Sequence, residues 1–222
     1  LEKGASALLV EKDVDFSEAA VVKVRSSRDA MAILSANFYE YPAEKLRLIG
    51  ITGTNGKTTT TYLLKSILET GGKRAGLLGT ISTQIGDKVL ESTRTTPEAL
   101  DLQRILREMV DAGMDYAVME VSSHSLDLGR VEGCNFSTGV FTNLTQDHLD
   151  FHKTIENYRN AKKKLFYKTC KANIINVDDE HGRIIAEEIH KLDTRLITYG
   201  IENKADIMAA NIDITSRGAS FT

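Results

Sequence analysis

The chain of 222 residues is 41% hydrophobic and 27% charged, enough for the core of one large domain, or of one domain and part of another. Its net charge of −3 gives no indication of a nucleic-acid partner, and no apolar run approaches the ~20 residues of a membrane helix. Cys134 and Cys170 stand alone, without the spacing of a metal or redox pair, which favours free thiols in a reducing compartment such as the cytoplasm.

Taken in chain order, apolar residues alternate between strand and helix periods, which is typical of an α/β sheet with crossover helices. The predicted fold is therefore a mostly parallel sheet flanked by helices. Helices are expected over residues 27–39, 57–70, 97–112 and 155–167. Strands are expected over residues 7–10, 20–24, 46–52, 74–78, 116–121, 138–142, 172–177 and 195–199, with an edge or hairpin strand over 207–215.

Two of the predicted helices have clear local signals. Thr96 is expected to be the N-cap of the third helix, with Pro97 at its first position and Gly113 just past its end. The second helix is closed by the glycines that follow it. One face of it is expected to carry Leu63, Leu64, Ile67 and Leu68.

A glycine-containing loop joins the buried strand over residues 46–52 to the second helix. It has the sequence Gly53-Thr54-Asn55-Gly56-Lys57-Thr58. Glycines let backbone amides converge on anionic oxygens, and a helix N-terminus adds a partial positive charge. In such a loop Lys57 reaches the β- and γ-phosphates of a nucleotide, and the Thr58 hydroxyl is a ligand for Mg²⁺. The strict phosphate-loop pattern is not met, because Ile51 occupies the place of its first glycine.

The loop, extended to Thr59, resembles that of the Mur ligases, which build the peptide of bacterial cell-wall precursors. Further segments follow in the order that this family requires, and together they look most like the member that adds the third amino acid. These segments are Thr95-Thr96-Pro97-Glu98, residues 119–124 (MEVSSH), residues 143–152 (NLTQDHLDFH) and residues 158–162 (YRNAK).

The resemblance implies a domain organisation. Residues 1–45 resemble the C-terminal part of the family's N-terminal, UDP-binding domain, and residues 46–222 resemble its central ATP-binding domain. The family's C-terminal domain, which selects the incoming amino acid, has no counterpart here. We therefore expect a piece of a longer ligase that is inactive alone.

The resemblance also implies a reaction. Family members use ATP to phosphorylate a substrate carboxylate, and an amine then attacks the acyl phosphate to form an amide. The expected substrates are UDP-N-acetylmuramoyl-L-Ala-D-Glu and a diamino acid, with L-lysine and meso-diaminopimelate both left open. The expected cofactor is Mg²⁺, because several negative charges must be neutralised together. Nucleic acid and membrane are not expected as partners, and the protein is expected to be a monomer.

Four residues are candidate metal ligands by this resemblance. They are Thr58, Glu120 at the end of a strand, His148, and Lys162, which matches a lysine that is carbamylated in the family. Carbamylation converts a cation into an anion that can bind Mg²⁺. The alternatives are a solvated glutamate, a surface histidine beside Asp147, and an unmodified surface lysine.

A second set of residues matches positions that hold the UDP-sugar peptide in the family. Hydroxyls together with a guanidinium suit a ligand rich in phosphates and carboxylates. Arg94 and Leu128 depart from residues found in some members, which leaves the finer substrate contacts open, as is the role of His124. The set consists of Thr95, Thr96, Ser122 and Arg130.

Two other activities fit part of the pattern. A folylpolyglutamate synthetase also joins amines to carboxylates through ATP, but the segments around Thr95 and Ser122 favour the cell-wall substrate. A GTPase switch shares the phosphate loop, but no Asn-Lys-x-Asp guanine-reading segment is present. The carboxylate of Glu120 together with His148 would have no purpose in such a switch.

Overall fold

The computed structural model describes residues 4–15, 17–216 and 218–222. Residues 1–3 and 16 of the first predicted domain, and residue 217, therefore lie outside the described part. Within that part, no helix has the length and apolar character needed to span a bilayer. The helices are α1 (Ser27–Phe38), α2 (Lys57–Thr70), α3 (Ala99–Asp111), α4 (Ser123–Asp127), α5 (Leu149–His152), α6 (Ile155–Lys163) and α7 (Glu180–Ile189), with short 3-10 helices η1 (Pro42–Glu44) and η2 (Lys164–Lys168).

Most of the described strands belong to one nine-stranded sheet with the order β11-β10-β9-β8-β3-β7-β4-β5-β6. The strands from β11 to β4 are parallel, whereas β5 and β6 add an antiparallel hairpin at one edge. The predicted, mostly parallel α/β sheet is confirmed. The strands of this sheet are β3 (Arg47–Thr52), β4 (Ala75–Leu78), β5 (Ser82–Ile85), β6 (Lys88–Glu91), β7 (Tyr116–Glu120), β8 (Phe136–Phe141), β9 (Thr169–Asn176), β10 (Arg195–Gly200) and β11 (Ile207–Met208).

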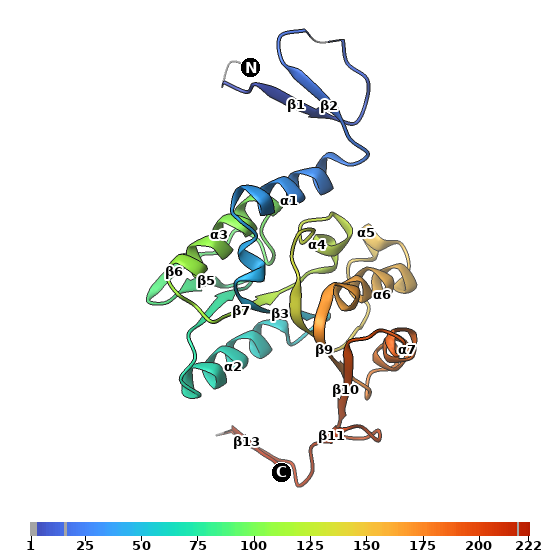
Figure 1. Cartoon of the computed structure of the whole chain (residues 1–222). Coiled ribbons are helices and arrows are strands. Elements are labelled where there is room, and N and C mark those ends of the chain that lie inside the picture. The colour runs from blue at the N-terminus through green and yellow to red at the C-terminus, as the bar shows by residue number, and fades with distance from the viewer. Residues whose placement is uncertain (1–3, 16, 217) are drawn as a thin grey trace.

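The first two strands form a small sheet that is not part of the nine-stranded one. Strands β1 (Ala7–Val10) and β2 (Ala20–Lys23) lie where strands were predicted, and they pair in parallel. They lie at one end of the molecule, beyond α1, and the C-terminal strands lie at the other (Figure 1). Helix α1 begins where the Ser26 hydroxyl accepts from the Asp29 N–H, and it packs against α3.

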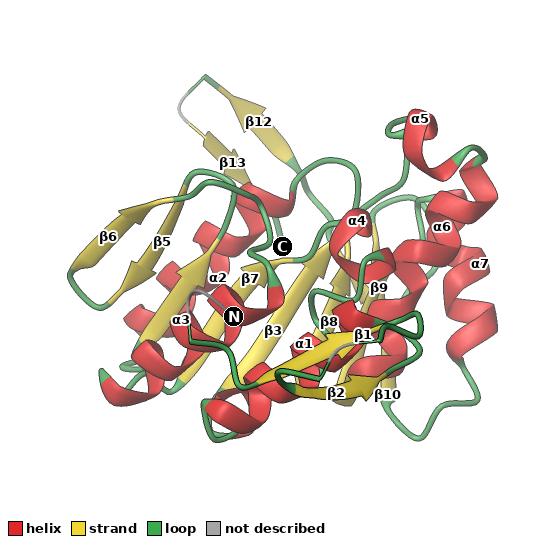
Figure 2. Ribbon diagram, turned by 90° about the horizontal axis from the view of Figure 1, so that it is seen from above, coloured by secondary structure: helices red, strands yellow, loops and turns green. Residues whose placement is uncertain are grey.

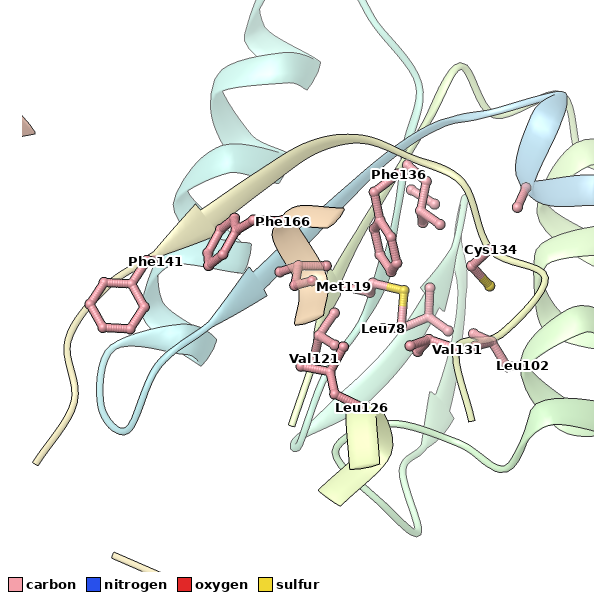
Figure 3. Packing of buried hydrophobic residues seen from close by; sticks show 14 of the residues in the cluster. Leu78, Leu102, Met119, Val121, Leu126, Val131, Cys134, Phe136, Phe141 and Phe166 are labelled. Atoms are coloured by element: carbon pink, nitrogen blue, oxygen red, sulfur yellow. The ribbon is translucent and has the colours of Figure 1, made fainter. Parts of the chain in front are cut away.

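The core lies on both faces of the central strands. On one face, Ile51, Val118 and Val140 pack under α2. The larger cluster covers the opposite face and includes Leu78, Met119 and Phe136, which lie side by side in Figure 3. Helix α3 contributes buried Leu102, Leu106 and Met109 to this larger cluster.

Helix α2 contacts the sheet through a narrower stripe than predicted. Leu64 and Leu68 pack on the sheet, as expected. Leu63 and Ile67 are instead 59% and 65% exposed, so only half of the predicted four-residue apolar face packs on the sheet. Leu64 and Leu68 are four residues apart, so they share the helix face that is turned toward the sheet. Leu63 and Ile67 lie about 100° around the helix from that face.

The start of α3 also differs from the prediction. The helix begins at Ala99 with Glu98 as its N-cap, so Thr96 is not the cap and Pro97 is not its first residue. The Thr96 hydroxyl is engaged elsewhere, because it donates to the Glu120 carbonyl at 2.9 Å. Gly113 follows the helix in a left-handed conformation, as expected.

Other departures lie at the edges. The hairpin of β5 and β6 was not predicted, and the predicted helix over 155–167 is an α-helix only to Lys163, after which η2 continues. The alternating segment over 207–215 splits into β11, which joins the sheet, and β12 (Asp213–Thr215). Strand β12 then pairs in an antiparallel hairpin with β13 (Gly218–Ser220).

Candidate functional site

The carboxyl ends of β3, β4, β7 and β8 meet at one edge of the sheet, seen from above in Figure 2. The chain moves from β3 to β4 and β7 on one side and later adds β8 on the other side of β3. Such a switch in strand order opens a crevice at the carboxyl edge, where ligands of α/β sheets bind. The predicted phosphate loop follows β3 at this point.

The loop between β3 and α2 is bent into a fixed shape. Gly53 has a φ of 153° and Gly56 a φ of 82°, conformations that favour glycine. A Cβ at Gly53 would lie 1.9 Å from the Thr142 hydroxyl, so no side chain fits there. Lys57 folds back over the loop, and its ammonium donates to the Gly53 and Thr54 carbonyls at 2.8 Å each.

Residues that directly follow β8 form hydrogen bonds with the backbone of this loop. The Asn143 side chain accepts from the Asn55 N–H at 3.0 Å and donates to the Asn55 carbonyl at 3.1 Å. The Thr142 hydroxyl donates to the same carbonyl at 2.7 Å. Asn143 belongs to a segment that carries the family resemblance, but the sequence assigned it no role of its own.

Glu120 ends β7 and lies beside the loop. Its exposed fraction is 1%, which excludes a glutamate solvated at a strand end. One carboxylate oxygen accepts from the Thr58 hydroxyl at 3.0 Å and from the Thr80 N–H at 2.8 Å. The other accepts from the Thr80 hydroxyl at 3.0 Å. The carboxylate is therefore held in one orientation, next to the first turn of α2.

Thr80 and Gly79 are residues that the sequence analysis missed. A Cβ at Gly79 would lie 2.6 Å from a Glu120 carboxylate oxygen, so glycine makes room for the carboxylate. The available signal was positional: a glycine and a hydroxyl residue directly follow β4, at the same edge as the phosphate loop.

Lys162 lies on α6 and is 1% exposed, so it is not a surface lysine. Its amino group donates to the Gly53 carbonyl at 2.8 Å and lies 4.3 Å from the centroid of the Tyr158 ring. Burial lowers the pKa of Lys162 to about 6, and the positive charge of Lys57 adds to this shift. Burial also lowers the pKa of Lys57, against the opposing charges of Glu120 and Asp147.

His148 has a more open position than the other predicted ligands. Its side chain is 48% exposed, and its Nε2 lies 3.4 Å from an Asp147 carboxylate oxygen. Its ring centroid is 4.9 Å from that of His124 and 6.1 Å from that of Tyr158. The Tyr158 hydroxyl in turn lies 3.3 Å from the Thr54 hydroxyl of the phosphate loop.

The four predicted substrate residues form one connected group. The Thr95 and Thr80 hydroxyl oxygens lie within hydrogen-bond distance of each other, at 3.0 Å. Besides its bond to Glu120, the Thr96 hydroxyl accepts from the Ser122 N–H at 3.1 Å. Arg130 donates to the Thr96 carbonyl at 3.3 Å and pairs with Glu98 at 2.9 Å. This group lies next to the Glu120 carboxylate.

The donors around Glu120 suit a hard divalent cation. Mg²⁺ prefers oxygen ligands and binds proteins through one or two carboxylates together with substrate phosphates. The Glu120 carboxylate and the Thr58 hydroxyl provide such oxygens beside the phosphate loop. Among the described residues, no three histidine, cysteine, aspartate or glutamate side chains are close enough to hold a metal ion by themselves. The residues thus fit a cation whose remaining ligands come from a nucleotide.

Comparison with known proteins extends this picture. Residues 51–222 match the model of the Mur ligase middle domain. A UDP-N-acetylmuramoyl-L-alanyl-D-glutamate--2,6-diaminopimelate ligase from Alkaliphilus oremlandii is 52% identical over 221 residues, covering 100% of this chain and 45% of the relative. Its counterpart numbered 1 in Clostridium acetobutylicum is 54% identical over 222 residues, with the same coverage. The chain thus spans less than half the length of these curated relatives.

Solved structures agree with this match. A structure of a ligase with the same name superimposes with a TM-score of 0.86 at 31% identity, covering 99% of this chain and 45% of that one. A folylpolyglutamate synthase from Mycobacterium tuberculosis has a TM-score of 0.68 at 13% identity, covering 89% and 52%, and shares the fold alone.

The sheet and its loop define an α/β domain of the phosphate-loop class. The family follows from the match over residues 51–222: the chain belongs to the Mur ligases and contains their middle domain.

Proposed function

We propose that the chain is the ATP-binding part of a ligase that adds diaminopimelate to UDP-N-acetylmuramoyl-L-Ala-D-Glu through an acyl phosphate. The names of relatives at 52% and 54% identity support this choice over L-lysine. The observation that carries the proposal is the contact of Thr58 with the buried Glu120 carboxylate, beside a loop closed by Lys57.

The phosphate loop is proposed to bind ATP. The set comprises Gly53, Thr54, Asn55, Gly56, Lys57, Thr58 and Thr59. When a triphosphate enters, the Lys57 ammonium can exchange the Gly53 and Thr54 carbonyls for phosphate oxygens, which are stronger acceptors because they are charged. The amides of the loop and the N-terminus of α2 then face the same oxygens. The MurF ligase from Thermotoga maritima, which shares the fold at 18% identity, was solved in complex with ADP.

We propose that Thr58, Glu120, His148 and carbamylated Lys162 hold Mg²⁺. When bound, Mg²⁺ neutralises charge on the transferred phosphoryl group. Glu120 contributes a carboxylate that Thr58 and Thr80 already orient. His148 stands at the open side of the site and can turn toward the cation from its exposed position.

The carbamate of Lys162 is supported by its burial against Tyr158 and its position at the phosphate loop. Only a neutral amine adds to carbon dioxide, giving a carbamate and releasing a proton. A pKa lowered to about 6 leaves the amine mostly neutral at pH 7. Isotope-labelled bicarbonate should give a carbamate signal in carbon NMR of the wild type that is absent in Lys162→Ala. Absence of that signal, with no rescue of Lys162→Ala by bicarbonate, would exclude the modification.

The muramyl-peptide substrate is proposed to bind along Thr95, Ser122 and Arg130, with the buried Thr96 holding Ser122 in place beneath it. Their hydroxyls and guanidinium suit phosphates and carboxylates, and their contacts lead directly to Glu120. In this proposal residues 1–45 complete a UDP-binding domain and residues 46–222 form the ATP-binding domain. A further domain supplies the amino-acid site, so this chain alone should form no amide. We expect the whole protein to act as a monomer.

The test is a coupled assay of ADP release by a protein that carries this chain at the full length of its relatives. Release should require ATP, UDP-N-acetylmuramoyl-L-Ala-D-Glu and diaminopimelate together. Stimulation by a folate and glutamate instead would favour the folylpolyglutamate reaction. A preference for GTP over ATP would contradict the ligase assignment.

A further inference from the structure

A second group of side chains lies outside the phosphate loop and links α4 to α5. His152 lies between two residues of α4: its Nε2 is 2.9 Å from the Ser123 hydroxyl, and its Nδ1 is 3.1 Å from an Asp127 carboxylate oxygen. The other oxygen of Asp127 accepts from the Lys164 ammonium at 2.6 Å. The three residues thus have the connectivity of a serine–histidine–aspartate triad.

This triad is not arranged for nucleophilic attack. Ser123 is 2% exposed and the His152 side chain 1%, so no substrate atom can reach the hydroxyl. A nucleophilic serine also needs open space next to its hydroxyl, where the substrate atom that it attacks can lie. The contacts of this group therefore serve to hold His152 in one orientation, and not to activate a nucleophile.

The two partners of His152 determine its protonation state and orientation. A carboxylate accepts, so Nδ1 carries the proton toward Asp127, and Nε2 then accepts from the Ser123 hydroxyl. Burial lowers the pKa of His152, which keeps the ring neutral at pH 7. Each ring nitrogen thus has one partner, and both partners lie on the same short helix.

The position of His152 joins two walls of the proposed site. On one side, Ser123 is the neighbour of Ser122, which caps α4 and contacts Thr96. On the other side, the His152 ring lies 5.0 Å from that of Tyr158, which contacts both Thr54 and Lys162. The contacts of His152 therefore connect α4, next to the predicted substrate residue Ser122, with α6, which carries Lys162.

We propose that His152 is a positioning residue for the muramyl-peptide substrate, fixing Ser122 through Ser123 and Asp127 relative to the phosphate loop. This role rests on the proposed function. It assigns His152 no contact with the reacting atoms. ATP should be affected less, because Lys57, Asn143 and Thr142 hold the phosphate loop without help from α4.

The test uses three variants in the full-length protein. Ser123→Ala removes the hydrogen bond at Nε2, Asp127→Asn removes the negative charge that faces Nδ1, and His152→Phe removes both contacts while keeping a ring. Each should raise KM for the UDP-muramyl dipeptide about 10-fold, the worth of one or two hydrogen bonds, and KM for ATP less than about 2-fold. His190→Phe is the matched control, because His190 is exposed at the C-terminal end of α7.

Proton–nitrogen correlation NMR adds a readout that does not depend on activity. The wild type should show His152 as the Nδ1–H tautomer, and Asp127→Asn should shift it toward Nε2–H. Equal changes in both KM values, or a lower unfolding midpoint with unchanged KM, would overturn the positioning role. An Nε2–H tautomer in the wild type would overturn it as well. A wild type without ligase activity would instead count against the proposed function, while the tautomer would still test the bonding of His152.

Discussion

Thr80 binds both oxygens of the Glu120 carboxylate, through its backbone N–H at 2.8 Å and its hydroxyl at 3.0 Å. Because Thr58 donates to the same carboxylate, the end of β7, the turn after β4 and the start of α2 are tied at one point. Thr80 also reaches Thr95, so it joins the proposed cation site to the proposed substrate wall.

Replacing Thr80 with valine should weaken the dependence of activity on Mg²⁺. The substitution keeps the shape but removes the hydroxyl that orients Glu120. Loss of a partner that orients a metal ligand typically costs about 10–100-fold in metal affinity or activity. A magnesium titration of ADP release measures this. Thr80→Ser, which keeps the hydroxyl, is the control, and equal behaviour of the two variants would contradict the assigned role.

Gly79→Ala should impair the site by displacing the Glu120 carboxylate, because the new Cβ would lie 2.6 Å from its oxygen. We expect magnesium-dependent activity to fall by at least about 10-fold. Gly71→Ala is a matched control, since its Cβ would meet only the Ile67 and Leu68 carbonyls at 3.4 Å. Similar activity of both variants would show that this close approach is unimportant.

Thr96→Val should destabilise the fold itself. The Thr96 hydroxyl is buried, and it satisfies the Glu120 carbonyl and the Ser122 N–H. Leaving these groups without a partner should lower the free energy of unfolding by about 1–3 kcal/mol, with a smaller loss for Thr96→Ser. Urea unfolding followed by circular dichroism gives the difference, and a neutral Thr96→Val would refute this bonding role.

Local sequence signals predicted the central sheet and the phosphate loop well. Strand β3, Gly56 and the first turn of α2 are contiguous, so their chemistry is visible in one short segment. Glu120 was selected by the family resemblance together with its place at the end of an apolar strand. The family resemblance selected Lys162 from a helix with several lysines, and the structure shows that it alone among residues 162–164 is fully buried.

The missed features depend on contacts between distant segments. Thr96 has the sequence of a helix cap, but its hydroxyl bonds to the end of β7, a contact that spacing alone does not reveal. The same holds for Thr80, whose partner is 40 residues away. On α2, Leu63 and Ile67 are apolar yet exposed. The amino-acid composition of a helix does not determine how much of the helix surface packs on the sheet.

Lys162 should make stability depend on pH. Its pKa of about 6 in the folded protein lies below the ordinary value of 10.5, so between these values the unfolded chain binds more protons. The free energy of unfolding should therefore rise with pH in that window, by up to about 1.4 kcal/mol per pH unit. Lys162→Met should lack this contribution. Urea unfolding in bicarbonate-free buffer at several pH values measures the difference, and parallel curves would contradict the shifted pKa.

The most direct test of the account is calorimetric titration with ATP in the presence and absence of Mg²⁺. The wild type should bind ATP, and Lys57→Met should weaken binding under both conditions by roughly 10–100-fold, the worth of a charged hydrogen bond. Glu120→Gln should weaken binding only when Mg²⁺ is present. No heat with ATP in a folded wild type, or equal affinities for all three proteins with Mg²⁺, would contradict the central claim that this loop and Glu120 bind one magnesium nucleotide.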